Sequence, residues 1–355
     1  MKARNAALAF GLVAATAIVG VALVAIAWPH ATGQPRREPR SPRGPCSVEA
    51  TCAIAPPDVG EPTGFRHTRS KLTAASGAPR HRGRDLLLRA SDPQWLIAKL
   101  AYGRADDDLE DEDVDVWVAR GCRAWERLAT VRTTSGDGQH PGAEGIADDE
   151  GRVFHRIPDA QRLAPGWHRV LFVVRGDGSR AEASIRVVGP ATRAVVSDVD
   201  GTLTHSEMAA FTSRAPPRAN PGAAEVLWAL ASRGYDIVYL TARPEWHVPT
   251  TRRWLAANGF PPGLLRTTTT TTGLFGDGAR DFKTAELRGF AERLGRAPDM
   301  GFGNMPSDVE AYAAGGVPAA SRYFFRLDGD ARGGVIHGDY RTLLPAMRAL
   351  PPLCR

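Results

Sequence analysis

The chain has 355 residues, a formal net charge of +6, and apolar and charged fractions of 43% and 24%. Its length suits two modest domains with extensions, and its composition excludes a chain that is disordered throughout. The Lys and Arg residues do not cluster with interleaved aromatic residues in the folded parts, which argues against nucleic-acid binding.

An uncharged apolar run covers residues 6–28, shortly after Lys2 and Arg4. About 20 apolar residues cross a bilayer as one helix, and the run is longer than the core of a signal peptide, so its length favours a single uncleaved membrane anchor. The alternative is an exported chain whose signal sequence is cleaved after residues 25–27, which have the small-x-small form of a cleavage site. Basic residues flank both ends of the run, so residues 1–28 do not predict which side of the membrane the protein faces.

Residues 29–84 are rich in Pro, Arg and Gly and show little hydrophobic periodicity. Such a segment buries too little apolar surface to offset the entropy of ordering it, so a flexible basic linker is predicted. Within it, Cys46 and Cys52 either close a small disulfide loop in an exported chain or are free thiols. The four cysteines of the chain are too widely spread for a zinc cluster.

Residues 85–189 have the pattern of an all-β module, because short apolar stretches recur between turn-forming glycines. We predict a small, immunoglobulin-like β-sandwich here. The acidic run 106–113 lacks the ligand spacing and turn glycine of a calcium loop, so it is expected to be the solvated end of a hairpin. The apolar stretches are residues 86–88, 95–100, 114–118, 169–174 and 183–188.

Residues 190–355 alternate between buried-strand and helix patterns, which predicts a Rossmann-like parallel sheet with helices on both faces. In such sheets ligands bind beyond the carboxyl ends of the strands. The threonine run 267–272 suits an edge strand or a loop. The predicted strands are 194–197, 235–240, 300–302 and 323–327, and the predicted helices are 221–233, 249–258, 284–294 and 308–314.

The first of these strands runs into D-V-D-G-T at residues 198–202. Two carboxylates two residues apart can divide the work of phosphate-ester hydrolysis. Asp198 is the candidate nucleophile, and Asp200 the candidate acid that protonates the leaving oxygen and then activates water. Thr202 is expected to hold Asp200 in place. The alternative for the motif alone is a polar turn, since Asp and Gly are turn formers.

Further candidates follow the later strands in order. Thr241 is predicted to hydrogen-bond a phosphoryl oxygen, with the charge of Arg243 nearby, and Lys283 to neutralise the phosphoryl group and the nucleophile. Asp308 and Asn304 are candidate metal ligands, although Asp308 also suits a helix N-cap. Each feature is weak alone, and their order at successive strand ends makes them strong together.

Mg²⁺ is the predicted cofactor. Asp198, Asp200, Asp308 and an anionic phosphate would repel one another, and a hard cation with oxygen ligands compensates that charge. Asp198, Asp200, Asp308 and Asn304 are therefore the predicted ligand set. No His/Cys cluster suggests a softer metal.

In order, these motifs resemble those of the haloacid dehalogenase superfamily. Residues 200–204, 239–243 and 302–309 are similar, more narrowly, to the lipin-type catalytic domain, which phosphatidate phosphatases share with modules of phosphatidylinositol-transfer proteins. The resemblance covers roughly residues 190–330. It implies phosphatidate as substrate or ligand, Mg²⁺ as cofactor, and activity over sensing because both motif aspartates are present.

About forty residues separate Asp200 from Thr241, and about forty separate Thr241 from Lys283, which the elements of the sheet largely use up. Little chain remains for a lid domain, so the site is expected to be capless and to meet a headgroup presented by a membrane surface. The leading hypothesis is a phosphatidate phosphatase. The alternatives are a phosphatase for another exposed phosphomonoester and a non-catalytic phosphatidate-binding module. No protein partner is predicted.

Overall fold

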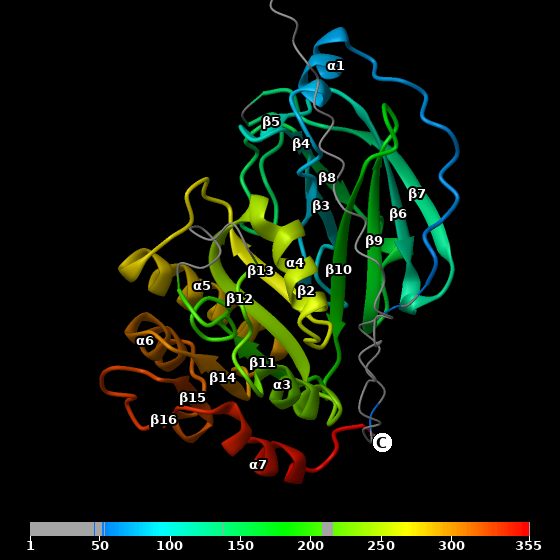
Figure 1. The fold of residues 1–355 in the computed structure, drawn as a ribbon. Coiled ribbons are helices and arrows are strands. Elements are labelled where there is room, and N and C mark those ends of the chain that lie inside the picture. Colours follow the sequence, from blue (N-terminus) through cyan, green and yellow to red (C-terminus); the bar gives the residue numbers. More distant parts are fainter. Residues whose placement is uncertain (1–45, 47–51, 53, 137, 208–215, 355) are drawn as a thin grey trace, which may run out of the picture. The chain divides into compact units, whose positions relative to one another are not determined.

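The computed structural model describes residues 46, 52, 54–136, 138–207 and 216–354 (Figure 1). Their strands form a β-sandwich and, after it, a parallel sheet flanked by helices. The sandwich part contains α1 (Thr68–Ala75), β1 (Arg82–Gly83), β2 (Leu86–Arg89), β3 (Trp95–Lys99), β4 (Ala101–Tyr102), β5 (Asp107–Asp108), β6 (Asp113–Ala119), β7 (Trp125–Arg132), β8 (Arg152–Arg156), β9 (Gly166–Val174) and β10 (Arg180–Val188).

The sandwich consists of a five-stranded sheet in the order β2-β10-β9-β6-β7 and a three-stranded sheet in the order β1-β3-β8. Alternate residues of its strands meet in one core, as Val114, Val116 and Val118 of β6 do. The predicted β-sandwich is confirmed. The predicted apolar stretches correspond to β2, β3, β6, β9 and β10. Strand β7 was not predicted, because none of the residues of this edge strand is fully buried and several are charged.

The end of the stretch predicted as a linker holds α1 and β1. The carboxylate of Glu112 accepts the backbone N–H groups of Arg66 at 2.9 Å and His67 at 3.0 Å, at the start of α1. A carboxylate is favoured at a helix N-terminus, where N–H groups lack partners. The partner lies about 45 residues along the chain, so the local composition did not reveal it.

The acidic run begins at the turn of the β4–β5 hairpin and contains β5, and its carboxylates face cations. Asp106 pairs with Arg82 at 2.7 Å, and Asp108 pairs with Lys99 at 2.9 Å. The run is therefore an ion-paired hairpin end and not a purely solvated one.

A buried histidine makes the stability of the sandwich depend on pH. His81 is 5% exposed, its Nδ1 accepts the N–H of Ala101 at 3.1 Å, and its Nε2 lies 2.8 Å from the hydroxyl of Ser179. Burial lowers the pKa of His81 from 6.5 to about 4. The stability that the neutral ring contributes is thus present above pH 6.5 and is lost as the pH falls toward about 4.

We expect the free energy of unfolding of the wild-type protein to fall across this window by on the order of 3 kcal/mol more than that of His81→Asn. The asparagine oxygen can still accept the N–H of Ala101 but does not titrate. Urea denaturation at a series of pH values measures the difference. Parallel pH curves for the two proteins would contradict the role assigned to His81.

The second part is a six-stranded sheet in the order β13-β12-β11-β14-β15-β16, with every neighbouring pair parallel. The threonine run 267–272 begins with the last two residues of β13, an edge strand of this sheet, and continues into the following loop. The elements are β11 (Ala194–Ser197), α3 (Ala223–Ala231), β12 (Asp236–Pro244), α4 (Val248–Ala257), β13 (Leu264–Thr268), α5 (Gly276–Leu294), β14 (Met300–Gly303), α6 (Pro306–Ala314), β15 (Arg322–Phe325), β16 (Val335–His337) and α7 (Leu344–Ala349).

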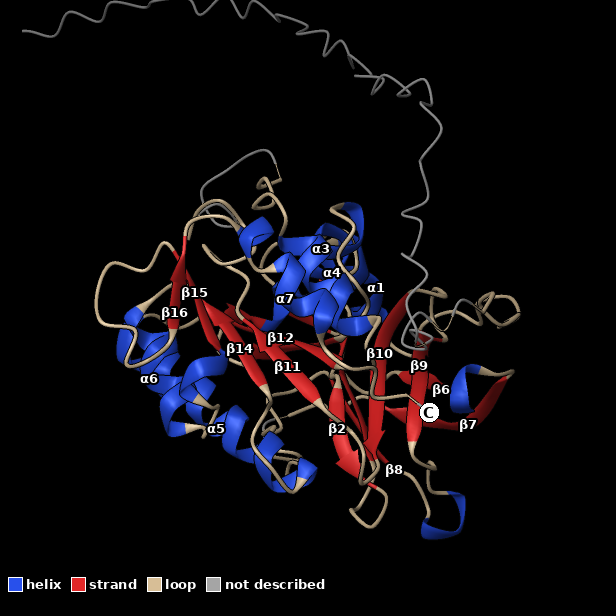
Figure 2. Cartoon of the chain, turned by 90° about the horizontal axis from the view of Figure 1, so that it is seen from below, coloured by secondary structure: helices blue, strands red, loops and turns tan. Residues whose placement is uncertain are grey.

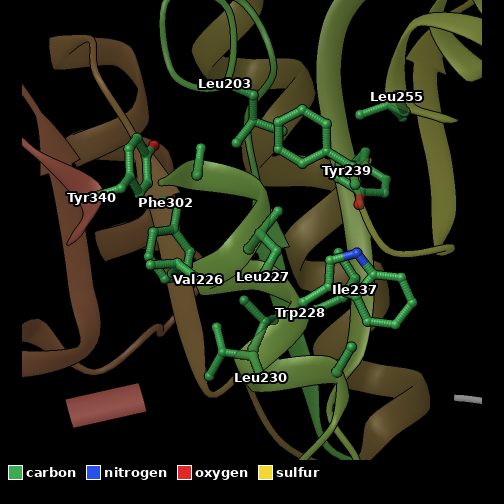
Figure 3. Packing of buried hydrophobic residues seen from close by; sticks show 14 of the residues in the cluster. Leu203, Val226, Leu227, Trp228, Leu230, Ile237, Tyr239, Leu255, Phe302 and Tyr340 are labelled. Carbon is green, nitrogen blue, oxygen red and sulfur yellow. The ribbon is translucent and has the colours of Figure 1, made fainter. Parts of the chain in front are cut away.

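Both faces of this sheet are covered by helices, as predicted. Figure 2 shows α3, α4 and α7 on one face and α5 and α6 on the other. Neighbouring residues of one strand enter different cores: Ile237 and Tyr239 pack with α3, and Val238 and Leu240 pack with α5 and α6. Figure 3 shows the first of these cores, in which Trp228 and its neighbours on α3 meet β12. The alternating strand and helix pattern therefore predicted the class of fold correctly.

Buried ion pairs join the sandwich to the helix-flanked sheet. Glu245, in the 3-10 helix Glu245–His247, accepts Arg82 of β1 at 3.0 Å and Arg152 of β8 at 2.7 Å. Arg84, just after β1, pairs with Glu286 of α5 at 3.2 Å. The contact between the two parts of the fold is thus polar as well as apolar. The 3-10 helix that carries Glu245 begins only two residues after the predicted site residue Arg243.

The cysteines pair differently from either prediction. Cys46 is bonded to Cys354, and Cys52 is bonded to Cys122. Neither a Cys46–Cys52 loop nor free thiols in a linker are found, because each cysteine lies against a partner that is distant in sequence. The first bond ties the start of the described chain to its end, across 308 residues.

The predicted membrane anchor is corrected. Among the residues described, no helix is long and apolar enough to cross a membrane. The longest, α5, carries charged side chains along its length. The apolar run on which the prediction rested, and residues 29–45 of the predicted linker, lie outside the described residues.

Candidate active site

The predicted site residues lie at the carboxyl ends of β11, β12 and β14 and on the helices that follow. Asp198 is the first residue after β11, and its N–H donates to the carbonyl of Phe302 in β14 at 2.9 Å. Lys283 lies in α5, which begins at Gly276, earlier than predicted. Since the strands are parallel, residues far apart in sequence meet at one edge of the sheet.

Lys283 is the centre of the site. Its ammonium donates to Asp198 Oδ1 at 2.7 Å and to Asp308 Oδ1 at 2.6 Å. All three side chains are nearly inaccessible to solvent: those of Lys283 and Asp198 are each 6% exposed, and that of Asp308 is 0% exposed. A buried ammonium shared by two carboxylates is held by charge-assisted hydrogen bonds, which are stronger than neutral ones.

Asp308 is fixed by backbone as well as by Lys283. Its Oδ2 accepts the N–H groups of Asn304 at 3.0 Å and Met305 at 3.1 Å, at the start of α6. Asp308 is thus not the N-cap of α6, which is Met305, but the third residue of the helix, and one of its oxygens accepts the N–H groups at the helix start while the other meets Lys283.

Asp200 faces a different cation. Arg243 donates to its two oxygens at 2.8 Å and 2.7 Å, and Thr241 donates at 3.1 Å. Arg243 is itself buried and also donates to Thr251 at 2.9 Å. Thr241 and Arg243 were predicted to face a phosphoryl group, whereas here they hold the candidate acid.

Thr202 was predicted to hold Asp200, and it lies against Asp198 instead. Its hydroxyl is 3.0 Å from Asp198 Oδ2 and 2.7 Å from Asn304 Oδ1, so its single proton serves one of them at a time. The Asn304 amide nitrogen donates to Glu207. Thr202 thus orients the candidate nucleophile because the turn carries its side chain back toward the end of β11.

The turn after β11 depends on Gly201 of the motif and on two residues that sequence reasoning missed. Gly201 has a φ of 69°, and a Cβ there would overlap the Glu207 carboxylate and the Asn304 amide. Asn220 and Tyr340 both donate to the carbonyl of Thr202, at 2.7 Å and 3.1 Å. Only Gly201 had a local signal, as a glycine in a turn motif.

The site holds more negative than positive charge. Burial raises the pKa of Asp198 well above its ordinary range, and the Asp308 and Glu207 carboxylates add to this effect while Lys283 opposes it. Burial also raises the pKa of Glu207 to about 7. For Lys283, burial acts to lower the pKa, but Asp198 and Asp308 outweigh it and raise the value. An additional cation would relieve this excess.

Two of the four predicted Mg²⁺ ligands fit a hard cation together. Asp198 and Asp308 both accept a hydrogen bond from the ammonium of Lys283, and their side chains offer only carboxylate oxygens as ligands. In proteins Mg²⁺ is commonly bound by one or two carboxylates and keeps several waters. Asp200 and Asn304 face other partners. Within the described ranges, no group of three or more Asp, Glu, His or Cys is spaced to hold a metal ion. The structure therefore brings two of the four predicted ligands together, Asp198 and Asp308, and the ligand set itself stays a prediction.

A cavity of about 80 Å³ opens over these groups. Its floor is polar, and its mouth carries the apolar side chains of Phe275 and Met305, neither of which the sequence analysis singled out. The lining residues are Asp198, Asp200, Glu207, Ala242, Arg243, Leu274, Phe275, Gly276, Ala279, Lys283, Met305 and Ser307.

The two parts of the fold match described families. Residues 79–187 match the family described as "PITM 1-3, beta-sandwich domain", and residues 195–325 match "PITM 1-3, LNS2 domain". The chain therefore carries a β-sandwich domain followed by an LNS2 domain.

Among similar proteins is the rat membrane-associated phosphatidylinositol transfer protein 1, 30% identical over 260 residues, which are 73% of this chain and 19% of the rat protein. The Drosophila protein retinal degeneration B is 29% identical over 256 residues, 70% of this chain and 18% of that protein. The chain thus corresponds to about a fifth of the length of these relatives. A cobalt-bound deoxy-D-mannose-octulosonate 8-phosphate phosphatase from Haemophilus influenzae aligns with 44% of this chain and 88% of its own, at 16% identity and a TM-score of 0.33, too low to argue from.

Proposed function

We propose that this protein binds the phosphate group of phosphatidate at a lipid surface and hydrolyses it, with Mg²⁺, to diacylglycerol through an aspartyl-phosphate. The observation that carries the proposal is the buried carboxylate of Asp198 beside the ammonium of Lys283, at 2.7 Å, on the floor of an open cavity. A carboxylate that faces a cation is suited to attack a phosphoryl group whose negative charge the cation balances.

In the proposed reaction an oxygen of Asp198 attacks phosphorus, and the bond from phosphorus to the diacylglycerol oxygen breaks. That oxygen takes a proton, for which Asp200 is the candidate donor. Water then attacks the phosphorus of the aspartyl-phosphate and gives a proton to the Asp200 carboxylate, which regenerates the acid, while the bond from phosphorus to Asp198 breaks, releasing orthophosphate and restoring the Asp198 carboxylate. Lys283 balances charge in both steps. Both oxygens of Asp200 accept hydrogen bonds from Arg243, so proton donation requires that the two side chains first part.

Asp198 and Asp308 would hold the Mg²⁺, which when bound supplies charge neutralisation at the phosphoryl oxygens. Thr202 keeps Asp198 oriented toward the cavity, and the backbone N–H groups of Asn304 and Met305 keep Asp308 in place.

A phospholipid substrate is supported by the similarity to membrane-associated phosphatidylinositol transfer protein 1 and by the resemblance to lipin-type domains. It is also supported by the connections around the site. The described residues between Asp200 and Thr241 supply α3 and part of β12, and those between Thr241 and Lys283 supply α4, β13 and the start of α5. No additional lid domain occurs among these described residues, which suits a phosphate presented by a surface.

The Arg243–Asp200 pair favours a second candidate function, phosphatidate binding without turnover. A candidate acid whose two oxygens accept a planar guanidinium, at 2.7 Å and 2.8 Å, is well held in that position. Phosphate would then bind beside Lys283 and dissociate unchanged.

Phosphate release by the purified full chain distinguishes these functions. Phosphatidate in detergent micelles, a soluble phosphomonoester and a phosphopeptide would each be supplied with Mg²⁺ or with EDTA. We expect release from phosphatidate in micelles, dependent on Mg²⁺, and little from the soluble substrates. Equal rates on all three substrates would contradict a lipid substrate. Phosphatidate binding without release would favour the second candidate.

A further inference from the structure

Two large apolar side chains that are exposed to solvent lie at the candidate site. In the described part of the chain five are exposed: Leu72, Phe275, Met305, Val335 and Ile336. Phe275, at 62% exposure, and Met305, at 42%, both line the cavity that contains Asp198 and Lys283. Exposed apolar side chains beside a polar site mark a surface that contacts an apolar partner.

The positions of these two side chains are set by the site itself. Phe275 immediately precedes α5, which carries Lys283, and Met305 immediately precedes α6, which carries Asp308. The N–H of Met305 donates to Asp308 Oδ2 at 3.1 Å. On the other side, the N–H of Leu274 donates to the carbonyl of Ala242 at 3.0 Å, which ties the turn before Phe275 to β12. Both apolar groups are therefore held at fixed places around the polar floor.

The size of the cavity separates what enters from what stays outside. A volume of about 80 Å³ open to the centres of water molecules holds a few waters, at roughly 10–15 Å³ each on that measure. A phosphate group fits such a space, whereas glycerol esters and acyl chains do not. Hydrocarbon attached to a phosphate in the cavity must therefore lie at the mouth, against Phe275 and Met305.

We propose that Phe275 and Met305 form an apolar rim that inserts among the acyl chains of a bilayer while a phosphate monoester headgroup enters the cavity. The partner is a lipid surface, because an amphiphile with phosphate next to hydrocarbon satisfies the charged floor and the apolar mouth at once. This inference rests on the proposed function and adds to it the residues that contact the membrane.

The test compares Phe275→Ser, Met305→Ser and the double variant with the wild-type full chain. Leu72→Ser and Ile336→Ser are matched controls, since these residues are 71% and 49% exposed and do not line the cavity. Cosedimentation with phosphatidylcholine vesicles that contain phosphatidate measures surface binding. Calorimetric titration with a soluble phosphomonoester measures the affinity of the cavity for a phosphate group in the absence of a membrane. We expect the double variant to lose vesicle affinity by about tenfold or more, the controls to bind vesicles like wild type, and all variants to bind the soluble ligand equally.

Several outcomes overturn the inference. Rim variants that bind vesicles like wild type, or controls that lose as much affinity, would remove the special role of this rim. Rim variants that lose the soluble ligand or a phosphopeptide would show that the two side chains act on the cavity or on a protein partner. Wild-type binding to the soluble ligand but not to vesicles overturns the rim alone, and binding to neither overturns the proposed function as well.

Discussion

Asp198→Asn is expected to lower the rate of phosphate release by about 10³-fold or more, while phosphate binding persists. The single amide oxygen of asparagine can still accept the ammonium of Lys283, and the amide nitrogen can donate to the hydroxyl of Thr202, whose own proton then goes to Asn304 Oδ1, so the side chain keeps its place. It is a poor nucleophile, however, and no aspartyl-phosphate forms. The change also removes one negative charge that faces the phosphate, which favours binding of the anion.

Asp299→Asn is the matched control. Its carboxylate accepts the N–H of Ala194 at 3.2 Å, at the end of β11 opposite to Asp198, so the same chemical change is made away from the cavity. Release of phosphate and calorimetric binding of phosphatidate micelles would be measured for both variants. An Asp198→Asn protein with near wild-type turnover would contradict the assignment of Asp198 as nucleophile. Asp200→Asn tests the role of the residue that Arg243 holds. If this variant loses turnover but still binds phosphatidate, the result supports Asp200 as the proton donor.

Glu245→Leu is expected to lower the free energy of unfolding by about 3 kcal/mol, because it removes the buried carboxylate that two buried guanidinium groups share and leaves each with one partly exposed carboxylate, Asp106 or Asp149. The side chains of Arg82 and Arg152 are 4% and 3% exposed, and both donate to Glu245. Although burial acts to raise the pKa of Glu245, the two arginines lower it overall, so the carboxylate is the form present at neutral pH.

The effect should reach the site as well as the stability. Glu245 follows Arg243 by two residues, so release of the 3-10 helix from the sandwich loosens the arginine that holds Asp200. Urea denaturation measures the stability, and phosphate release measures the site. Glu245→Gln, which keeps the shape and one acceptor, should cost less and serves if the leucine variant does not fold.

Glu126→Leu is the control for this second prediction, since the Glu126–Arg120 pair is exposed and such pairs contribute about 0–1 kcal/mol. A Glu245→Leu protein that loses no more stability than Glu126→Leu would show that the buried pairs between the domains contribute little. Replacement of Glu245, Arg82 and Arg152 together by apolar residues should recover much of the loss, because no buried charge is left unpaired. The other carboxylates keep a cation, Asp106 with Arg80 and Asp149 with Lys99.

Much of the architecture was predictable because helices and strands depend on sequence patterns that extend over only a few residues. Residues 194–197 and 235–240 are mainly apolar runs of strand length, and they correspond to β11 and the first part of β12. The helix predicted from residue 284 begins at Gly276 instead, because the first two turns of α5 are polar and carry little periodicity. Strand β7 was missed for a related reason, since an exposed edge strand needs few apolar residues.

The sequence by itself determined which parts of the chain meet at the site. Parallel strands place their carboxyl ends at one edge, so the order of Asp198, Thr241, Lys283 and Asp308 along the chain was enough to bring them together. Only the tertiary structure decided which carboxylate pairs with which cation: Lys283 with Asp198 and Asp308, and Arg243 with Asp200. It likewise decided that Cys46 bonds to Cys354 and that Glu245 joins the two domains. The physical reason is that local periodicity fixes strands and helices over a few residues, whereas the choice among charged or thiol partners depends on distances that exist only after the whole chain has packed.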